Sequence, residues 1–375
     1  MTCFFSYAII GLATVIGPKI YAKYTEDETM NDMNPKALGY VVVTDYLEAN
    51  TGNDVSDAIQ KIIDENPMKT IFFPDGEYVL AKPICTSGKP ENAVSLMLSN
   101  FATIKAADDW SNPEEALVKL GAAEPYNTIY RNGSNYSFVG GIVDGNMVAS
   151  GISIDSGRET CIRNVSIKHT FIGIHVKRGA NNGSSDADID TVNIVGNNRP
   201  GSIGVLVEGY DNTFTNMRIA AIQIGFLLKS GGNFMRNIHP LFIYGYEYLD
   251  NDFMFFEDSV AFWDQTGGSN WYDYCYSDQM ATGYRFAPGA KPIVMNAFIM
   301  WYSAKGNKEV AFDCPGEFKA SITNARVHFR GDTTGNIFLT GGKEGGCGII
   351  ENPIFDKNLA SDTDYENFLT GRIIW

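Results

Sequence analysis

The feature that most constrains the fold of this chain is a short strand pattern that recurs along its length. Its copies are Gly151–Asp155, Gly173–Lys177, Gly204–Glu208 and Gly225–Lys229, with looser copies at Ser259–Trp263, Gly283–Phe286 and Glu309–Asp313. Each copy alternates apolar and outward-facing residues, which is typical of a β-strand. Strands this short cannot bury their apolar side chains alone, whereas stacked coils can. The repeat therefore predicts a solenoid of parallel strands.

A second pattern, an Asn followed by alternating residues, precedes these strands. The Asn occupies the same position in six repeats, which we call the Asn slot: Asn164, Asn216, Asn237, Asn296, Asn324 and Asn352. Thr191 and Tyr274 fill this slot in two further repeats. Asn tolerates a left-handed backbone, and its amide can bond to the equivalent amide one coil along. We therefore expect an asparagine ladder along one turn of the solenoid.

Composition narrows the class of protein. Hydrophobic residues make up 44% of the 375 residues, which is enough for an extended core and too much for a disordered chain. The formal net charge of -15 argues against a nucleic-acid partner, because binding phosphates requires a basic surface. The six Cys residues show no CxxC spacing, so no zinc site or redox pair is indicated.

The two ends of the chain differ from the repeats. Residues 1–22 hold an apolar stretch that is too short to span a bilayer comfortably, and they are predicted to be a signal peptide or, alternatively, an N-terminal cap. If these residues are a signal peptide, the mature protein is expected to be secreted or bound at the cell surface, without a membrane span. Residues 23–94 are expected to form a cap with one short amphipathic helix, residues 95–357 the solenoid, and residues 358–375 a C-terminal tail or cap.

Three features resemble the pectate-lyase-like superfamily of right-handed parallel β-helix proteins, particularly its polygalacturonase-related and phage tailspike-like branches. They are the segments Phe73–Tyr78 and Gly140–Asn146 and the series of coils, and together they cover roughly residues 40 to 355. The resemblance implies an all-β, single-stranded right-handed parallel β-helix with a short N-terminal capping helix, and activity on a polysaccharide. The polygalacturonase motifs Asn-Thr-Asp, His-Gly and Arg-Ile-Lys are missing. No catalytic residue is therefore carried over from that enzyme.

Acidic residues in neighbouring turns suggest a pair of catalytic carboxylates. Asp186 lies in an insertion at 179–189, and Asp211 occupies the corresponding turn one coil along. Carboxylates on adjacent coils lie roughly 5–10 Å apart, which spans the separations that glycosidases use. Asp264 is a further catalytic candidate. Alternatively, Asp186 and Asp188 would point to one side of an extended segment and could bind Ca²⁺, and no other cofactor is expected.

The outward residues that follow the Asn slot form a second candidate site. Arg218, His239 and Tyr276 occupy this column in the middle of the solenoid, and hydrogen-bonding and aromatic side chains along a groove suit successive sugars. His239 is a catalytic candidate in this column, and the alternative is a polar face exposed to solvent. The predicted substrate-binding residues are Arg218, Tyr276, Glu208, Trp271 and Asp278. Glu208 also belongs to a column of alternating charge that predicts a structural ionic ladder: Asp155, Lys177, Glu208 and Lys229.

These features favour an extracellular glycoside hydrolase that acts on a polysaccharide or oligosaccharide with two carboxylates. A polysaccharide lyase is the first alternative, in which His239 removes a proton beside a uronate while Arg218 or Ca²⁺ neutralises its carboxylate. A non-catalytic glycan-binding or structural β-helix, such as a tail or adhesin component, is the second. The aromatic and acidic insertion at 241–258 predicts either a carbohydrate platform or a subunit contact, as in a homotrimer.

Overall fold

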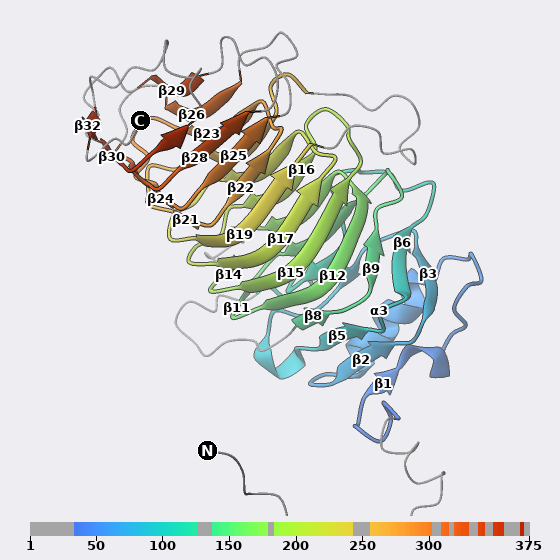
Figure 1. The fold of residues 1–375 in the computed structure, drawn as a ribbon. Helices are drawn as coiled ribbons and strands as arrows, with labels where there is room; N and C mark the ends of the chain where they lie inside the picture. Colours follow the sequence, from blue (N-terminus) through green and yellow to red (C-terminus); the bar gives the residue numbers. More distant parts are fainter. Residues whose placement is uncertain are drawn as a thin grey trace, which may run out of the picture.

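The computed structural model describes residues 34–125, 137–178, 184–242, 256–301, 309–314, 319–329, 337–341, 348–355 and 368–370. The predicted signal peptide and most of the insertion at 241–258 lie outside these residues. In the described part the chain is a right-handed parallel β-helix, as expected. A 20-stranded sheet and a 10-stranded sheet run along its axis, with a two-stranded sheet beside them (Figure 1). The strands of neighbouring coils pair in parallel.

The N-terminal end is closed by the predicted amphipathic helix, α3 (Ser56–Glu65). Its Ile59, Ile62 and Ile63 are buried, while the neighbouring Ala58 is exposed. Figure 1 shows this helix beside the first strands of the large sheet. The large sheet begins at β1 (Val41–Val42), so parallel pairing starts well before residue 95.

The large sheet contains most of the strands. After β1 they are β2 (Thr70–Phe73), β3 (Gly76–Leu80), β5 (Ser95–Leu98), β6 (Ala102–Ala106), β8 (Ser137–Val139), β9 (Ile142–Asp144), β12 (Cys161–Thr170), β15 (Asp188–Gly196), β17 (Thr213–Ala220), β19 (Phe234–Leu241), β21 (Trp271–Asp273), β22 (Tyr276–Asp278), β24 (Ile293–Met295), β25 (Phe298–Trp301), β27 (Ser321–Thr323), β28 (Arg326–Phe329), β30 (Gly348–Glu351), β31 (Ile354–Phe355) and β32 (Phe368–Thr370).

The 10-stranded sheet contains the strands that begin with the Gly pattern. It consists of β4 (Ile84–Cys85), β7 (Ala116–Leu120), β10 (Ser150–Ile154), β13 (Ile172–Val176), β16 (Ile203–Val207), β18 (Ile224–Leu228), β20 (Val260–Asp264), β23 (Thr282–Phe286), β26 (Val310–Cys314) and β29 (Ile337–Gly341). The two-stranded sheet pairs β11 (Gly157–Arg158) with β14 (Ser184–Ser185).

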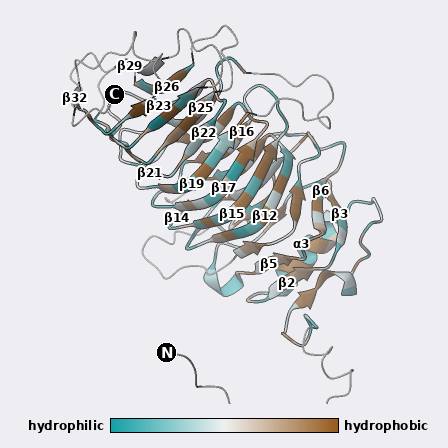
Figure 2. Cartoon of the chain, in the orientation of Figure 1, coloured by the Kyte–Doolittle hydropathy of each residue, from teal (hydrophilic) through white to brown (hydrophobic). Residues whose placement is uncertain are grey.

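The inward residues of both sheets form one continuous core, because successive side chains of a strand point to opposite faces. Figure 2 shows this alternation as hydrophobic and hydrophilic bands along the strands. In the 10-stranded sheet, stacked rings of Phe226, Phe262, Tyr284 and Phe312 continue from coil to coil, with centroids 4.8 to 6.0 Å apart. The core therefore repeats with the coils and lengthens with the stack.

The recurring Gly is explained by a close approach between coils. A Cβ at Gly151, Gly173, Gly204, Gly225 or Gly283 would lie 2.4 to 2.7 Å from a carbonyl oxygen of the next coil. Two of the three looser copies, those at Ser259 and Glu309, were aligned wrongly by sequence. Because Ile224 pairs with Val260, Ala261 rather than Ser259 occupies the Gly position, and Ala311 rather than Glu309 occupies it in β26.

The asparagine ladder is confirmed. All eight residues of the Asn slot, Thr191 and Tyr274 included, adopt a left-handed backbone with φ between 50° and 56°. The amide nitrogen of Asn237 donates to the amide oxygen of Asn216 (2.9 Å), and the series resumes from Asn324 to Asn296 (3.1 Å) and from Asn352 to Asn324. The ladder thus holds the bend of the large sheet in register from coil to coil.

An Asp replaces the missing amide wherever the ladder is interrupted. Asp190 directly precedes Thr191, and it accepts a hydrogen bond from the amide nitrogen of Asn216 (2.8 Å) on the following coil. Asp273 directly precedes Tyr274, and it accepts one from Asn296 (3.0 Å) in the same way. Each interruption therefore leaves the next Asn of the ladder with an acceptor.

A second asparagine ladder lies inside the helix, where the chain enters the large sheet. Asn212, Asn233 and Asn270 are fully buried and occupy equivalent positions in three coils. The amide of Asn212 donates to Asn233 (2.9 Å), and the amide of Asn233 donates to Asn270 (3.2 Å). The sequence pattern did not reveal this ladder, because an inward polar residue looks like any turn residue.

The column of alternating charge is confirmed as an ionic ladder at the end of the 10-stranded sheet. Lys177 lies 2.7 Å from Asp155, and Lys229 lies 3.1 Å from Glu208. Opposite charges on adjacent coils avoid the repulsion that like charges would cause.

Candidate functional site

Four of the predicted site residues meet on the outer face of the large sheet. Arg218 of β17 is in register with His239 of β19, and Tyr276 of β22 occupies the same column on the next coil. The ring of Tyr276 stacks on that of His239, with centroids 4.1 Å apart and planes 16° apart. Asp278 follows two residues later on the same strand. We call Arg218, His239, Tyr276 and Asp278 the His239 cluster.

The centre of this cluster holds polar atoms that are buried without a complete set of partners. His239 Nε2 faces Asp278 Oδ2 at 3.5 Å, which is too long for a strong hydrogen bond. His239 Nε2 and Asp278 Oδ1 are both buried, and neither has a hydrogen-bond partner among the described residues. Buried polar atoms are nearly always paired in folded proteins. The lack of partners for His239 Nε2 and Asp278 Oδ1 makes this position a candidate binding site.

Arg218 adds an exposed positive charge beside His239. It makes no ion pair with any residue that the structure describes, although the chain as a whole carries a net charge of -15. Most other arginines that project from the sheets have acidic partners, such as Arg163 with Asp188 and Arg285 with Asp313 (2.8 Å). Arg218 is therefore available to an anionic ligand.

The stacking of the rings determines what the column offers to a ligand. His239 and Tyr276 use a face on each other, and Tyr276 contacts Phe298 with its ring centroid 4.9 Å away. Rings stacked along the axis present their edges outward. The column is therefore suited to polar contacts at its ring edges rather than to stacking on the face of a sugar, although the Tyr276 hydroxyl already contacts Met300 Sδ at 3.8 Å.

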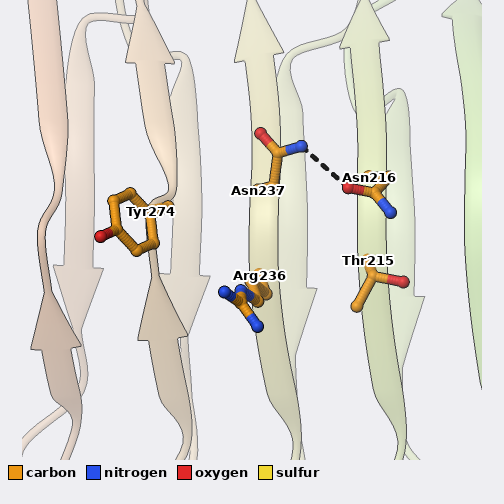
Figure 3. Close-up of a pocket in the computed structure, with 5 residues that line it drawn as sticks. All are labelled: Thr215, Asn216, Arg236, Asn237 and Tyr274. Carbon is orange, nitrogen blue, oxygen red and sulfur yellow. Dashed lines mark hydrogen bonds between the residues drawn. The ribbon is translucent and has the colours of Figure 1, made fainter. Parts of the chain in front are cut away.

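A pocket of about 470 Å³ adjoins the cluster (Figure 3). Its walls are Thr215, Asn216, Arg236, Asn237 and Tyr274, which come from β17, β19 and the turn after β21. Asn237 and Tyr274 each stand two residues before a member of the His239 cluster. Three of the lining residues, Asn216, Asn237 and Tyr274, belong to the Asn slot that the sequence predicted, whereas no sequence pattern singled out Arg236.

Asp186 and Asp211 are brought together as expected, at the edge where the chain enters the large sheet. They occupy equivalent left-handed positions of adjacent coils, with φ of 54° and 59°. Asp186 forms an ion pair with Arg158 at 2.7 Å. Burial and the negative charge of Asp186 raise the pKa of Asp211 above its usual range. One carboxylate is thus paired with an arginine, while the pKa of the other is raised.

Asp186 and Asp188, the residues of the alternative calcium site, have separate partners in the structure. The segment is not extended, because Asp186 has a left-handed backbone, and the two carboxylates pair with different arginines, Arg158 and Arg163. Within the described ranges, no group of three or more His, Cys, Asp or Glu side chains is arranged to hold a metal ion. The arginines supply the positive charge that a cation would have brought.

Asp264 lies inside the helix, at the end of β20. Its side chain is fully buried, and it accepts hydrogen bonds from Asn270, from Tyr272 and from the backbone of Thr266, all at 3.0 Å. Burial raises its pKa to about 6, against the opposing effect of these hydrogen bonds. A carboxylate enclosed in this way is unsuited to contact a polysaccharide. It terminates the buried asparagine ladder instead.

Glu208 lies on the other sheet, away from the His239 cluster. His175 Nε2 is 3.0 Å from its carboxylate, and Lys229 is 3.1 Å from it. Burial opposes ionisation of Glu208, but these two hydrogen bonds lower its pKa overall. Burial also lowers the pKa of His175. Trp271 starts β21 and pairs with Phe234, which lies two residues before Arg236, so Trp271 lies beside the pocket rather than in its lining.

A protein-family model matches more than half of the chain. Residues 40–240 match the model described as rhamnogalacturonase A/epimerase, pectate lyase-like. The chain belongs to this family. Members of this pectate lyase-like family share the β-helix described above, and the expected resemblance to that superfamily is thereby confirmed. Comparison with curated proteins by sequence gives no match.

Solved structures with the same fold include several carbohydrate-related proteins. An endo-xylogalacturonan hydrolase from Aspergillus tubingensis superposes with a TM-score of 0.57 at 13% identity, over 87% of this chain and 98% of that one. A tailspike protein mutant of E. coli bacteriophage HK620, solved with a pentasaccharide, gives 0.60 at 11% identity, over 91% and 66%. The A-module of mannuronan C-5 epimerase AlgE4 of Azotobacter vinelandii gives 0.50 at 14% identity, over 88% and 100%.

The family and these structures support a carbohydrate-active β-helix. At these identities the solved structures show the fold alone, so they assign no catalytic residue to the pectate lyase-like chain. No helix in the described residues is long and apolar enough to cross a membrane.

Proposed function

We propose that this pectate lyase-like protein is a polysaccharide-processing enzyme that removes a proton beside a uronate carboxylate, with His239 as the base. One observation carries the proposal: His239 Nε2 is buried against Asp278 while an unpaired Arg218 stands one coil away. This is the reaction of the lyase that the sequence offered as an alternative. The geometry favours it over hydrolysis, which ranked first on sequence.

The two ring nitrogens of His239 have different surroundings. Nε2 faces Asp278, which favours the tautomer with its proton on Nε2. Nδ1 is then the unprotonated nitrogen, and in this proposal it is the atom that meets the substrate. Asp278 would also stabilise the imidazolium that forms when Nδ1 accepts a proton.

Arg218 supplies the second requirement of the reaction. The proton beside a uronate carboxylate is acidic only when the negative charge that develops on that carboxylate is neutralised, and a guanidinium does this with two parallel hydrogen bonds. In the lyase reaction the electrons of the broken C–H bond form a double bond, and the glycosidic oxygen leaves. Return of a proton to the opposite face of the same carbon would give epimerisation instead.

Hydrolysis by Asp186 and Asp211 is the second candidate. It is favoured by the environments of the two carboxylates, because Arg158 binds Asp186 while burial raises the pKa of Asp211. A carboxylic acid with a raised pKa beside a second carboxylate is typical of the acid of a glycosidase. Asp211 would act as the acid and Asp186 as the base or nucleophile.

A glycan panel separates the two candidates. Polygalacturonate, alginate and neutral polysaccharides are incubated with the protein, and both the ultraviolet absorbance of unsaturated products and new reducing ends are measured. The lyase reaction gives both signals on uronate polymers, whereas hydrolysis gives reducing ends alone. A change in the proton NMR spectrum of the polymer without chain cleavage identifies epimerisation.

Matched variants assign the activity to a site. His239→Gln is expected to abolish turnover, while His175→Gln, which alters a histidine beside a glutamate on the other sheet, leaves it intact. Full activity of His239→Gln together with loss in Asp211→Asn would transfer the reaction to the carboxylate pair. Glycan binding without turnover by the native protein would instead establish the non-catalytic alternative.

The remaining expectations about partners stay predictions. Secretion, assembly as a homotrimer and the absence of a nucleic-acid partner are proposed alongside a polysaccharide or oligosaccharide ligand. Analytical ultracentrifugation of the purified protein tests the trimer directly.

A further inference from the structure

Tyr274 occupies a backbone position that does not suit it. It fills the Asn slot with a φ of 52°, and 58% of its side chain surface is exposed. A left-handed backbone is uncommon for any residue other than Gly, Asn and Asp, and for a bulky residue it is an outlier that costs free energy. Exposure means that no core contact compensates for this cost. Such strain is characteristic of residues kept for a function.

An asparagine at this position would fit the stack better. The amide oxygen of Asn237 accepts no hydrogen bond from the described part of the chain, and Asn296 has turned its amide to Asp273. Asparagine at 274 would donate to Asn237 as Asn237 donates to Asn216. The tyrosine therefore breaks a ladder that the fold could complete.

The interruption of the asparagine ladder at Tyr274 lies in the lining of the pocket beside the His239 cluster. Figure 3 shows Tyr274 beside the strand that carries Arg236 and Asn237, with Thr215 and Asn216 on the strand beyond. Arg236 lies 3.7 Å from Asp273 and is more than half exposed. Unlike the stacked rings of His239 and Tyr276, the ring of Tyr274 has no aromatic neighbour among the described residues, so its face is open to a ligand.

We propose that Tyr274 is the stacking platform of a sugar subsite, on which one pyranose ring of the glycan lies while its hydroxyl groups bond to Asn237, Arg236 and Thr215. The inference rests on the proposed function only in the choice of a glycan as ligand. The subsite adjoins the proposed base, because Tyr274 and Asn237 each stand two residues from the His239 cluster. It would hold a sugar next to the one that reacts.

The test is Tyr274→Asn, which removes the ring and completes the ladder. We expect the melting temperature to rise by about 2 °C or more, because the strain is relieved and an amide bond is gained. Binding of size-defined oligogalacturonides, or of cello-oligosaccharides of matched length, is expected to weaken roughly tenfold by isothermal titration calorimetry. Tyr274→Phe keeps the ring and should retain binding.

Thr191→Asn is the matched control. It completes the same ladder three coils away from Tyr274, so it is expected to raise the melting temperature without changing glycan binding. All titrations use a background that carries both His239→Gln and Asp211→Asn, which removes the candidate residues of both reactions, so a failure of the proposed base leaves this test intact. Unchanged binding by Tyr274→Asn, equal loss in Thr191→Asn, or no binding of either oligosaccharide series by the unsubstituted Tyr274 protein would overturn the inference.

Discussion

Replacing Asn233 with alanine should destabilise the helix more than any exposed asparagine does. Asn233 is fully buried, and its amide oxygen accepts bonds from both the backbone nitrogen and the amide nitrogen of Asn212. Without it, these two buried donors lose their only described acceptor. The carbonyl of Ser230 and the amide oxygen of Asn270 each keep another donor. The expected loss therefore comes from the two donors of Asn212.

The size of the effect follows from this count. Each buried donor left without a partner costs about 1–3 kcal/mol, so Asn233→Ala is expected to lower the free energy of unfolding by roughly 2–6 kcal/mol. The comparison is Asn237→Gly, which removes one exposed amide bond (2.9 Å) and keeps the left-handed backbone without strain. Its cost should stay below about 1.5 kcal/mol.

Urea unfolding followed by circular dichroism measures both variants, and hydrogen exchange at the amide of Asn212 reports the local change. Solenoids can unfold in parts, so the local probe guards against a loss of cooperativity. Equal destabilisation by the two variants, or continued protection of the Asn212 amide in Asn233→Ala, would refute the argument that buried donors dominate the ladder.

Three further outcomes are expected. Asp264 has a pKa raised to about 6 in the folded chain, so its protonated form stabilises the fold. This contribution to the free energy of unfolding is full below about pH 4 and falls by up to about 3 kcal/mol as the pH rises through 6. Asp264→Asn should remove this decline in thermal melts. Asp278→Asn should lower kcat at least tenfold with little change in KM, because the tautomer of His239 is lost, and an unchanged kcat would contradict its positioning role. Arg218→Gln should raise KM for a uronate polymer roughly tenfold or more, and an equal effect on binding a neutral glycan would exclude charge as the cause.

The sequence predicted the parallel β-helix because its repeat reflects contacts between coils. The Asn slot was identified from Asn164 to Asn352, and each of its positions has the left-handed backbone that asparagine favours. The alignment of Ser259 and Glu309 was wrong by two residues, because Ala can replace Gly at the close approach and obscures the pattern.

The site was harder to predict because its parts depend on which residues face each other across coils. Arg218, His239 and Tyr276 could be chosen from their shared column, since register follows from the repeat, but no column indicated that Asp278 would face His239. The burial of Asp264 could not, because an acid at the end of a strand looks the same whether it points inward or outward. Its position became clear only from the buried ladder that it terminates.

The Asp before each interruption of the ladder gives the fold an unusual freedom to vary. Thr191 and Tyr274 lack the amide oxygen that an Asn would offer to the next coil. Asp190 and Asp273 supply a carboxylate oxygen in its place, so the slot residue of one coil can change while the Asn of the next coil keeps an acceptor. An Asp at the position before the slot thus allows the slot residue itself to be substituted. Substitutions at such positions change the side chain on the surface of one coil while the neighbouring coils keep their register.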